Sequence, residues 1–172
     1  MRMLRVGVFC AVSFGAAVLA QVQVHQGTLA SEDPKQFASP MVLDLPVHNF
    51  GLMRESQIVY FRDVTGYYCE DVTLQSLSMT RKRGTPAAPM RLDLAGVLFV
   101  RKSYDRFVTL NLSMRASEAV VATAKLDHVK VEEKKTRSFH VSLDLSPAQL
   151  AQLTTPGVAP QLRVSVIVAS DR

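Results

Sequence analysis

The sequence predicts an all-β fold, an antiparallel β-sandwich of about seven to eight strands with one short helix. Short runs in which apolar and polar residues alternate recur along the chain, and turn residues separate them. Stretches with the 3.6-residue period of a helix are nearly missing. Between residues 138 and 145, apolar side chains occupy every odd position and polar ones every even position. That alternation is typical of an antiparallel strand with one solvated face.

The predicted strands follow one another from residue 41 onward. Within the third of them the apolar positions change parity between Leu74 and Leu77, which predicts a β-bulge near Gln75 and Ser76. Residues 97–100 are apolar on both faces, which predicts a central strand covered on both sides. The expected bounds are Met41–Leu45, Gln57–Val64, Tyr67–Thr80, Met90–Val100, Phe107–Met114, Val120–Val131, Ser138–Leu145 and Leu162–Ala169. The side chains expected to face inward from different strands are Leu98, Leu110, Val141 and Val164.

One short helix is predicted between the last two strands. Ser146 can cap it, Pro147 suits the first helical position, and Gln149 stands three residues after the cap, as in a capping box. The helix should run from about Pro147 to Leu153 and place Leu150 and Leu153 over the open end of the sandwich.

The first twenty residues have the features of a secretory signal peptide. Arg2 and Arg5 provide the positive charge, and residues 6–19 form an apolar stretch that is too short to span a bilayer. Residues 18–20 supply the small-residue context for cleavage after Ala20. We therefore expect an exported protein, periplasmic or extracellular, with no transmembrane anchor after signal cleavage.

The chain divides into a signal peptide (1–20), a flexible leader (21–40) and one β-sandwich domain (41–172). The net charge of the whole chain is +5; residues 1–20 hold two of the twenty Lys and Arg and none of the fifteen acids, which leaves +3 for the rest. This mild excess falls short of the concentrated basic stripe that a phosphate backbone requires. No nucleic-acid partner is expected.

The residue types that carry most catalysis and metal binding are sparse. Cys10 lies in the predicted signal peptide, so Cys69 is alone in the remaining chain and should be a small buried hydrophobe, although an intermolecular bridge stays open. No Gly-x-Ser-x-Gly motif marks a serine nucleophile. The histidines, none of which are paired at a short metal-ligand spacing, are His25, His48, His128 and His140. We therefore expect no catalytic residue, no metal, no cofactor and no enzymatic activity.

The sharpest charge feature is the run Arg81, Lys82 and Arg83, predicted to lie in a loop between two long strands. Three adjacent cations can meet an anionic partner, whereas a run of this kind is also typical of a solvated loop. Counting the strands between the two loops leaves open whether a second set of cations lies at the same end of the sandwich: Arg101, Lys102 and Arg106.

Residues 94–145 contain a glycine-led apolar strand, a polar turn, a Val-x-Leu-x-Leu strand, and a charged approach to a Phe-x-Val-x-Leu strand. In this pattern they resemble the middle of exported bacterial immunoglobulin-like modules. The resemblance implies an immunoglobulin-like sandwich that serves binding, spacing or envelope assembly. The chain has no tryptophan and no cysteine pair to bridge the sheets, so no functional residue is carried over.

The sequence thus predicts an exported, non-catalytic module that contacts a protein or an anionic component of the cell envelope through Arg81, Lys82 and Arg83. The alternative is an exported enzyme or a carrier of a small ligand or metal, with a site built from residues distant in sequence.

Overall fold

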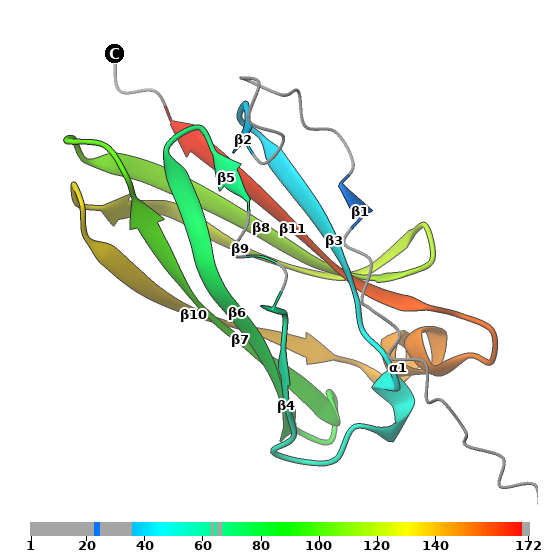
Figure 1. Cartoon of the computed structure of the whole chain (residues 1–172). Coiled ribbons are helices and arrows are strands. Elements are labelled where there is room, and N and C mark those ends of the chain that lie inside the picture. Colours follow the sequence, from blue (N-terminus) through cyan, green and yellow to red (C-terminus); the bar gives the residue numbers. More distant parts are fainter. Residues whose placement is uncertain (1–22, 25–35, 63, 65–66, 170–172) are drawn as a thin grey trace, which may run out of the picture.

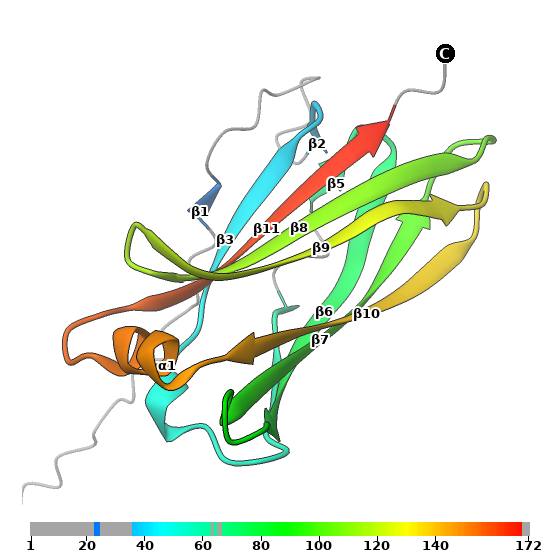
Figure 2. The same ribbon diagram turned by 180° about the vertical axis from the view of Figure 1, so that it is seen from behind.

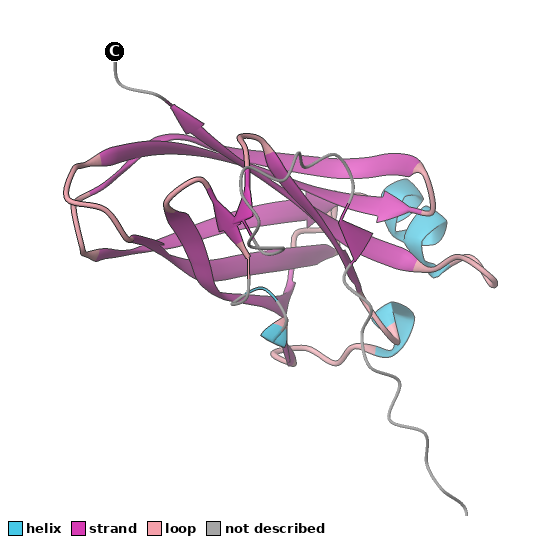
Figure 3. Ribbon diagram, turned by 45° about the horizontal axis from the view of Figure 1, so that its top comes forward, coloured by secondary structure: helices cyan, strands magenta, loops and turns pink. Residues whose placement is uncertain are grey.

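The structure is a computed structural model that describes residues 23–24, 36–62, 64 and 67–169. The predicted signal peptide, His25 and most of the predicted leader lie outside the described residues. Two β-sheets pack face to face (Figures 1 and 3), which confirms the predicted all-β sandwich. The part of the chain that is described contains eight strands of three residues or more.

The two sheets are built almost wholly from antiparallel pairs. One sheet has the strand order β1-β3-β11-β8-β9, and the other has the order β10-β7-β6-β5-β2, with β4 also paired to β6. The short pair β2–β5 is parallel. The elements are β1 (Gln23–Val24), β2 (Gln36–Phe37), β3 (Met41–Pro46), the 3-10 helix η1 (Phe50–Leu52), β4 (Ile58–Tyr60), β5 (Tyr68–Cys69), β6 (Val72–Arg83), β7 (Met90–Val100), β8 (Arg106–Ala116), β9 (Ala119–Val131), β10 (Thr136–Leu145), α1 (Pro147–Thr154) and β11 (Pro160–Ala169).

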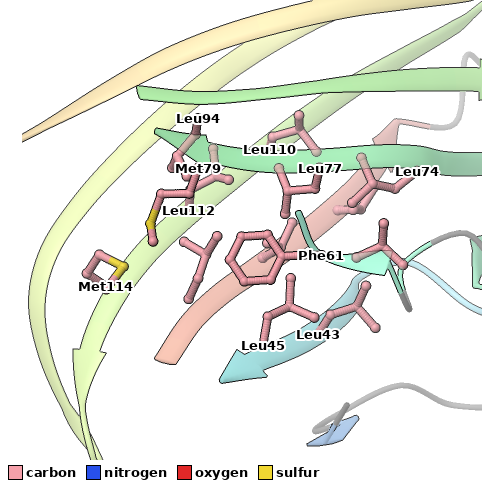
Figure 4. Close-up of a cluster of buried hydrophobic side chains, with 14 of the residues drawn as sticks. Leu43, Leu45, Phe61, Leu74, Leu77, Met79, Leu94, Leu110, Leu112 and Met114 are labelled. Carbon is pink, nitrogen blue, oxygen red and sulfur yellow. The ribbon is translucent and has the colours of Figure 1, made fainter. Parts of the chain in front are cut away.

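The core lies between the sheets and consists of alternate side chains from their facing strands (Figure 4). Leu98, Leu110 and Val164 are fully buried, as predicted, whereas Val141 is only partly buried against the core. The prediction that residues 97–100 are covered on both faces is wrong. β7 does lie between β6 and β10, but its outward side chains, such as Phe99, are only half-buried because no third layer covers that face in the described part.

The predicted bulge is confirmed, because the register between β6 and β7 shifts between Leu74 and Ser76. Gly96 of β7 lies beside it. A Cβ atom at Gly96 would approach the carbonyl oxygen of Ser76 to 2.5 Å and the ring of Phe139 to 2.6 Å. Glycine therefore lets three strands approach closely at the centre of this sheet.

Two predicted strands have different bounds in the structure. The prediction Gln57–Val64 contains only the three-residue β4, and Tyr67–Thr80 is a hairpin of β5 and β6 rather than one strand. Glu70 at the turn has a left-handed backbone with φ of 54°, which an extended strand does not contain. β6 continues to Arg83, so Arg81, Lys82 and Arg83 lie at the end of a strand and not in a loop.

The helix α1 is confirmed with its capping box. Gln149 N donates to Ser146 Oγ at 3.3 Å, and Ser146 N donates to Gln149 Oε1 at 2.9 Å. Leu153 is buried and Leu150 packs against the core. Figure 2 shows α1 at one end of the sandwich, where the chain passes from β10 to β11 and changes sheets.

Candidate functional site

The basic run at the end of β6 divides into one structural cation and two free ones. The guanidinium of Arg81 donates through Nη1 to the carbonyl of Met53. Its backbone is fastened to the same segment, since Ser56 N donates to Arg81 O at 2.8 Å and Arg81 N donates to Gln57 O at 3.1 Å. Arg81 therefore holds the chain before β4 against β6, which leaves it less able to meet a partner.

Lys82 and Arg83 are exposed and have no ion-pair partner among the residues that the structure describes. Lys82 lies directly opposite Arg91 of β7. Arg91 is compensated, with Asp93 at 3.2 Å and Asp144 at 3.9 Å from its Nε. Of the four cations in residues 81–91, Lys82 and Arg83 thus carry the free positive charge. Arg54 and Glu55, exposed in the neighbouring segment before β4, add one charge of each sign.

The tip of this hairpin is a tight turn. Gly84 N donates to Pro89 O at 3.2 Å, and Thr85 N donates to Ala88 O at 2.9 Å. A Cβ atom at Gly84 would lie 1.8 Å from the carbonyl oxygen of Ala88, so only glycine fits there. Residues 81–91 contain four cations and no acid. We call exposed Lys82 and Arg83, with the turn 84–89, the basic tip.

The structure decides the question that the sequence left open, because Arg101, Lys102 and Arg106 do not share an end with this run. They lie in and after the β7–β8 loop, at the other end of the sheets (Figure 1). β6 has 12 residues, and a rise of about 3.3 Å per residue separates its ends by about 35 Å. A small partner therefore cannot contact both groups of cations at once.

The opposite end is organised by a buried ion pair that sequence reasoning missed. Arg106 Nε donates to Asp71 Oδ1 at 2.9 Å and to Oδ2 at 3.0 Å, and the Asp71 side chain is 1% exposed. Burial alone would lower the pKa of Arg106, but its hydrogen bond to Asp71 and the charge of that carboxylate outweigh burial and raise this pKa. The pair joins β8 of one sheet to the turn that precedes β6 in the other. The two residues are 35 positions apart, so no local pattern indicated the contact.

An open groove of about 690 Å³ lies beside this ion pair, lined by Ser103, Tyr104, Asp105, Arg106 and Glu133. Arg106 stacks over the ring of Tyr104 at 4.3 Å, and Tyr104 is 44% exposed. A hydrogen bond from Lys130 lowers the pKa of Asp105. The groove therefore offers one aromatic ring with charged groups that already bind one another.

Two further arginines lie on the outer face of the sheet that contains β8 and β11. Arg163 Nε and Nη2 donate to the carboxylate of Asp44 at 2.6 and 2.7 Å, and this hydrogen bonding raises the pKa of Arg163. Arg115 is buried and donates through Nη2 to Glu118, whereas its Nε and Nη1 have no partner in the described part. The Arg163–Asp44 pair thus joins β11 to β3, and the Arg115 contact braces the β8–β9 hairpin.

Of the cysteines and histidines, residue types that metal ions favour, the structure describes Cys69 and three histidines, His48, His128 and His140. Within the described ranges, no three His, Cys, Asp or Glu side chains gather as a metal ion would require. His140 Nε2 lies 3.9 Å from Asp93, but Ser142 donates directly to Asp93 at 2.7 Å, so the hydroxyl is bonded to the acid and not to an imidazole. Cys69 is buried, and its thiol donates to the carbonyl of Val166 at 3.3 Å.

No family model matches the chain, and no curated protein sequence matches it. Neither helix of the described part is long and apolar enough to cross a membrane.

Proposed function

We propose that this protein is an exported, non-catalytic β-sandwich module that binds an anionic protein or envelope component through the basic tip. The observation that supports the proposal is the charge imbalance of the hairpin: residues 81–91 contain four cations and no acid. Two of the four, Lys82 and Arg83, are exposed with no ion-pair partner in the described part of the chain.

Uncompensated surface charge favours association more than it favours folding. Exposed ion pairs contribute about 0 to 1 kcal/mol to folding stability, whereas unpaired charges on a protruding tip speed the encounter with a partner of opposite sign. The resemblance of residues 94–145 to immunoglobulin-like modules agrees with a binding role and suggests an immunoglobulin-like topology.

The test is recovery of crosslinked partners from the native envelope with the wild-type protein and with the double variant Lys82→Gln/Arg83→Gln. Arg81 is left intact because its change would perturb the fold. We expect the double variant to recover several-fold less partner at an unchanged melting temperature, and added salt to weaken wild-type recovery, since the Debye length is about 8 Å at physiological ionic strength.

The matched control is Lys102→Gln/Lys134→Gln, which removes the same charge from exposed lysines at the opposite end. It should leave recovery unchanged. Recovery that responds neither to salt nor to the Lys82 and Arg83 changes would contradict the proposal.

A second candidate function is the binding of a small ligand in the groove beside Tyr104. The observation that favours it is an exposed aromatic ring in an open groove of about 690 Å³. A small molecule that copurifies with the protein and is lost in Tyr104→Ala would support this carrier function over the basic tip.

A further inference from the structure

The strand β4 presents a free edge. β6 is its pairing partner, and no second strand pairs with it in the described residues. The carbonyl of Gln57 accepts a backbone hydrogen bond from β6 at 3.1 Å, and the N–H of Phe61 donates one to β6 at 3.0 Å. Because the direction of these groups alternates along an antiparallel strand, Ile58 and Tyr60 turn their backbone N–H and C=O groups away from β6. An incoming strand would find these four groups available.

The side chains on this edge are suited to pairing. Ile58 is 47% exposed and Tyr60 is 66% exposed, and both lie on the outer face while Phe61 turns into the core. β-branched and aromatic residues stabilise cross-strand contacts. Protein edges are usually protected by charges or bulges, and the edge strand β9 has both, with register shifts in its pairing and the charges of Lys125, Asp127 and Lys130. β4 has neither a charge nor a bulge, and its short length of three residues is the one such protection that it has.

The charge of the basic tip continues this edge. Ile58 is opposite Thr80 of β6, so Lys82 lies two residues further along β6 on the same outer face. β4 is antiparallel to β6, and β6 runs toward the tip. A strand that pairs antiparallel with β4 therefore also runs toward the tip, and its carboxyl end arrives beside Lys82 and Arg83.

We propose that β4 is the docking edge for an extended segment of a partner protein, which adds as an antiparallel strand and carries acidic residues at its carboxyl end. The backbone groups of Ile58 and Tyr60 supply the hydrogen bonds of the pairing. Their side chains select apolar residues, and Lys82 and Arg83 select the acids, as in other cases of strand addition. The acidic part of this inference rests on the proposed function, and the strand pairing does not.

The test uses a fluorescein-labelled peptide of alternating threonine and valine that ends in three glutamates, with binding measured by fluorescence anisotropy. With valine on the face of Ile58 and Tyr60, the valine N–H groups point at β4 and the threonine N–H groups point to solvent. N-methylation of the valines should weaken binding at least about 10-fold. N-methylation of the threonines is the matched control and should change it little.

Two protein variants complete the design. Ile58→Asn/Tyr60→Asn should weaken binding several-fold with little change in melting temperature, because both side chains are exposed and asparagine disfavours strand pairing without adding charge. Lys82→Gln/Arg83→Gln should weaken it several-fold.

The outcomes separate the two proposals. Equal binding of both N-methylated peptides, or no binding of the unmodified peptide at millimolar concentration, would overturn strand addition. Sensitivity to valine methylation without any effect of the Lys82 and Arg83 changes would keep the docking edge and reject the basic tip.

Discussion

At the scale of the residue, successive cations in one strand have different roles because they have different contacts within the fold. The run that begins at Arg81 is an example. Its guanidinium binds the carbonyl of Met53, 28 positions away, whereas Lys82 and Arg83 are exposed. The sequence could predict a basic surface, because charge follows from residue type. It could not predict which of the three cations binds another part of the fold, since that depends on a contact between residues distant along the chain.

This division of roles predicts a stability difference. Arg81→Gln should lower the free energy of unfolding by about 1 to 3 kcal/mol, because it leaves the Met53 carbonyl without the charged donor. Arg83→Gln should change it by less than about 0.5 kcal/mol, as expected for an exposed surface residue. Urea denaturation of the two variants measures both. Equal losses would mean that the roles are assigned wrongly.

A second prediction at this scale concerns Cys69. Burial raises the pKa of its thiol to about 11 from an ordinary value of 9.0. The unfolded chain therefore releases this proton at lower pH than the folded chain. The difference in pKa contributes about 3 kcal/mol to the free energy of unfolding. This contribution is fully present below pH 9 and is lost as the pH rises toward 11.

Cys69→Ala removes this titration and keeps the other titrating groups. Between pH 8 and pH 10.5, the wild-type protein should lose about 2 kcal/mol more unfolding free energy than the variant. Urea denaturation at the two pH values measures the difference. Equal losses of unfolding free energy in the wild-type protein and the variant would show that the buried thiol does not cause the pH dependence.

At the scale of the element, alternation of apolar and polar residues predicted the long strands because each has one face on the core. β7 has the predicted bounds, Met90–Val100, and α1 has the predicted cap. The β5–β6 hairpin was missed because Glu70, which takes the left-handed position of its turn, is not a typical turn residue, and Asp71 alone does not mark a turn. The residue types around Glu70 do not indicate that its backbone is left-handed.

Gly96 provides the prediction at this scale. Gly96→Ala should destabilise the protein by about 1 to 3 kcal/mol or more, because the new methyl group meets the Ser76 carbonyl oxygen and the Phe139 ring. The control is Gly51→Ala, whose Cβ would sit 3.5 Å from Thr154 in ordinary contact. Thermal unfolding of the two variants measures the difference. A Gly96→Ala variant as stable as the Gly51→Ala variant would contradict the close approach of the three strands.

At the scale of the whole molecule, topology decides which loops meet. The sequence left open whether Arg106 lies beside the basic run; the chain runs the length of β7 between them, so Arg106 lies at the opposite end. Strand number and strand faces follow from local patterns, whereas strand order does not. The pairing of β11 between β3 and β8 joins segments more than 100 positions apart along the chain, and no residue pattern specifies that choice.

The central claim is that an acidic partner meets this molecule at the basic tip and the adjoining edge β4. The most direct measurement is a two-dimensional NMR titration of the ¹⁵N-labelled protein with the glutamate-terminated peptide. We predict chemical-shift changes concentrated in residues 56–60 and 81–90, weakened by salt. Changes concentrated in residues 101–106 and 132–135 would place binding at the opposite end and contradict the account.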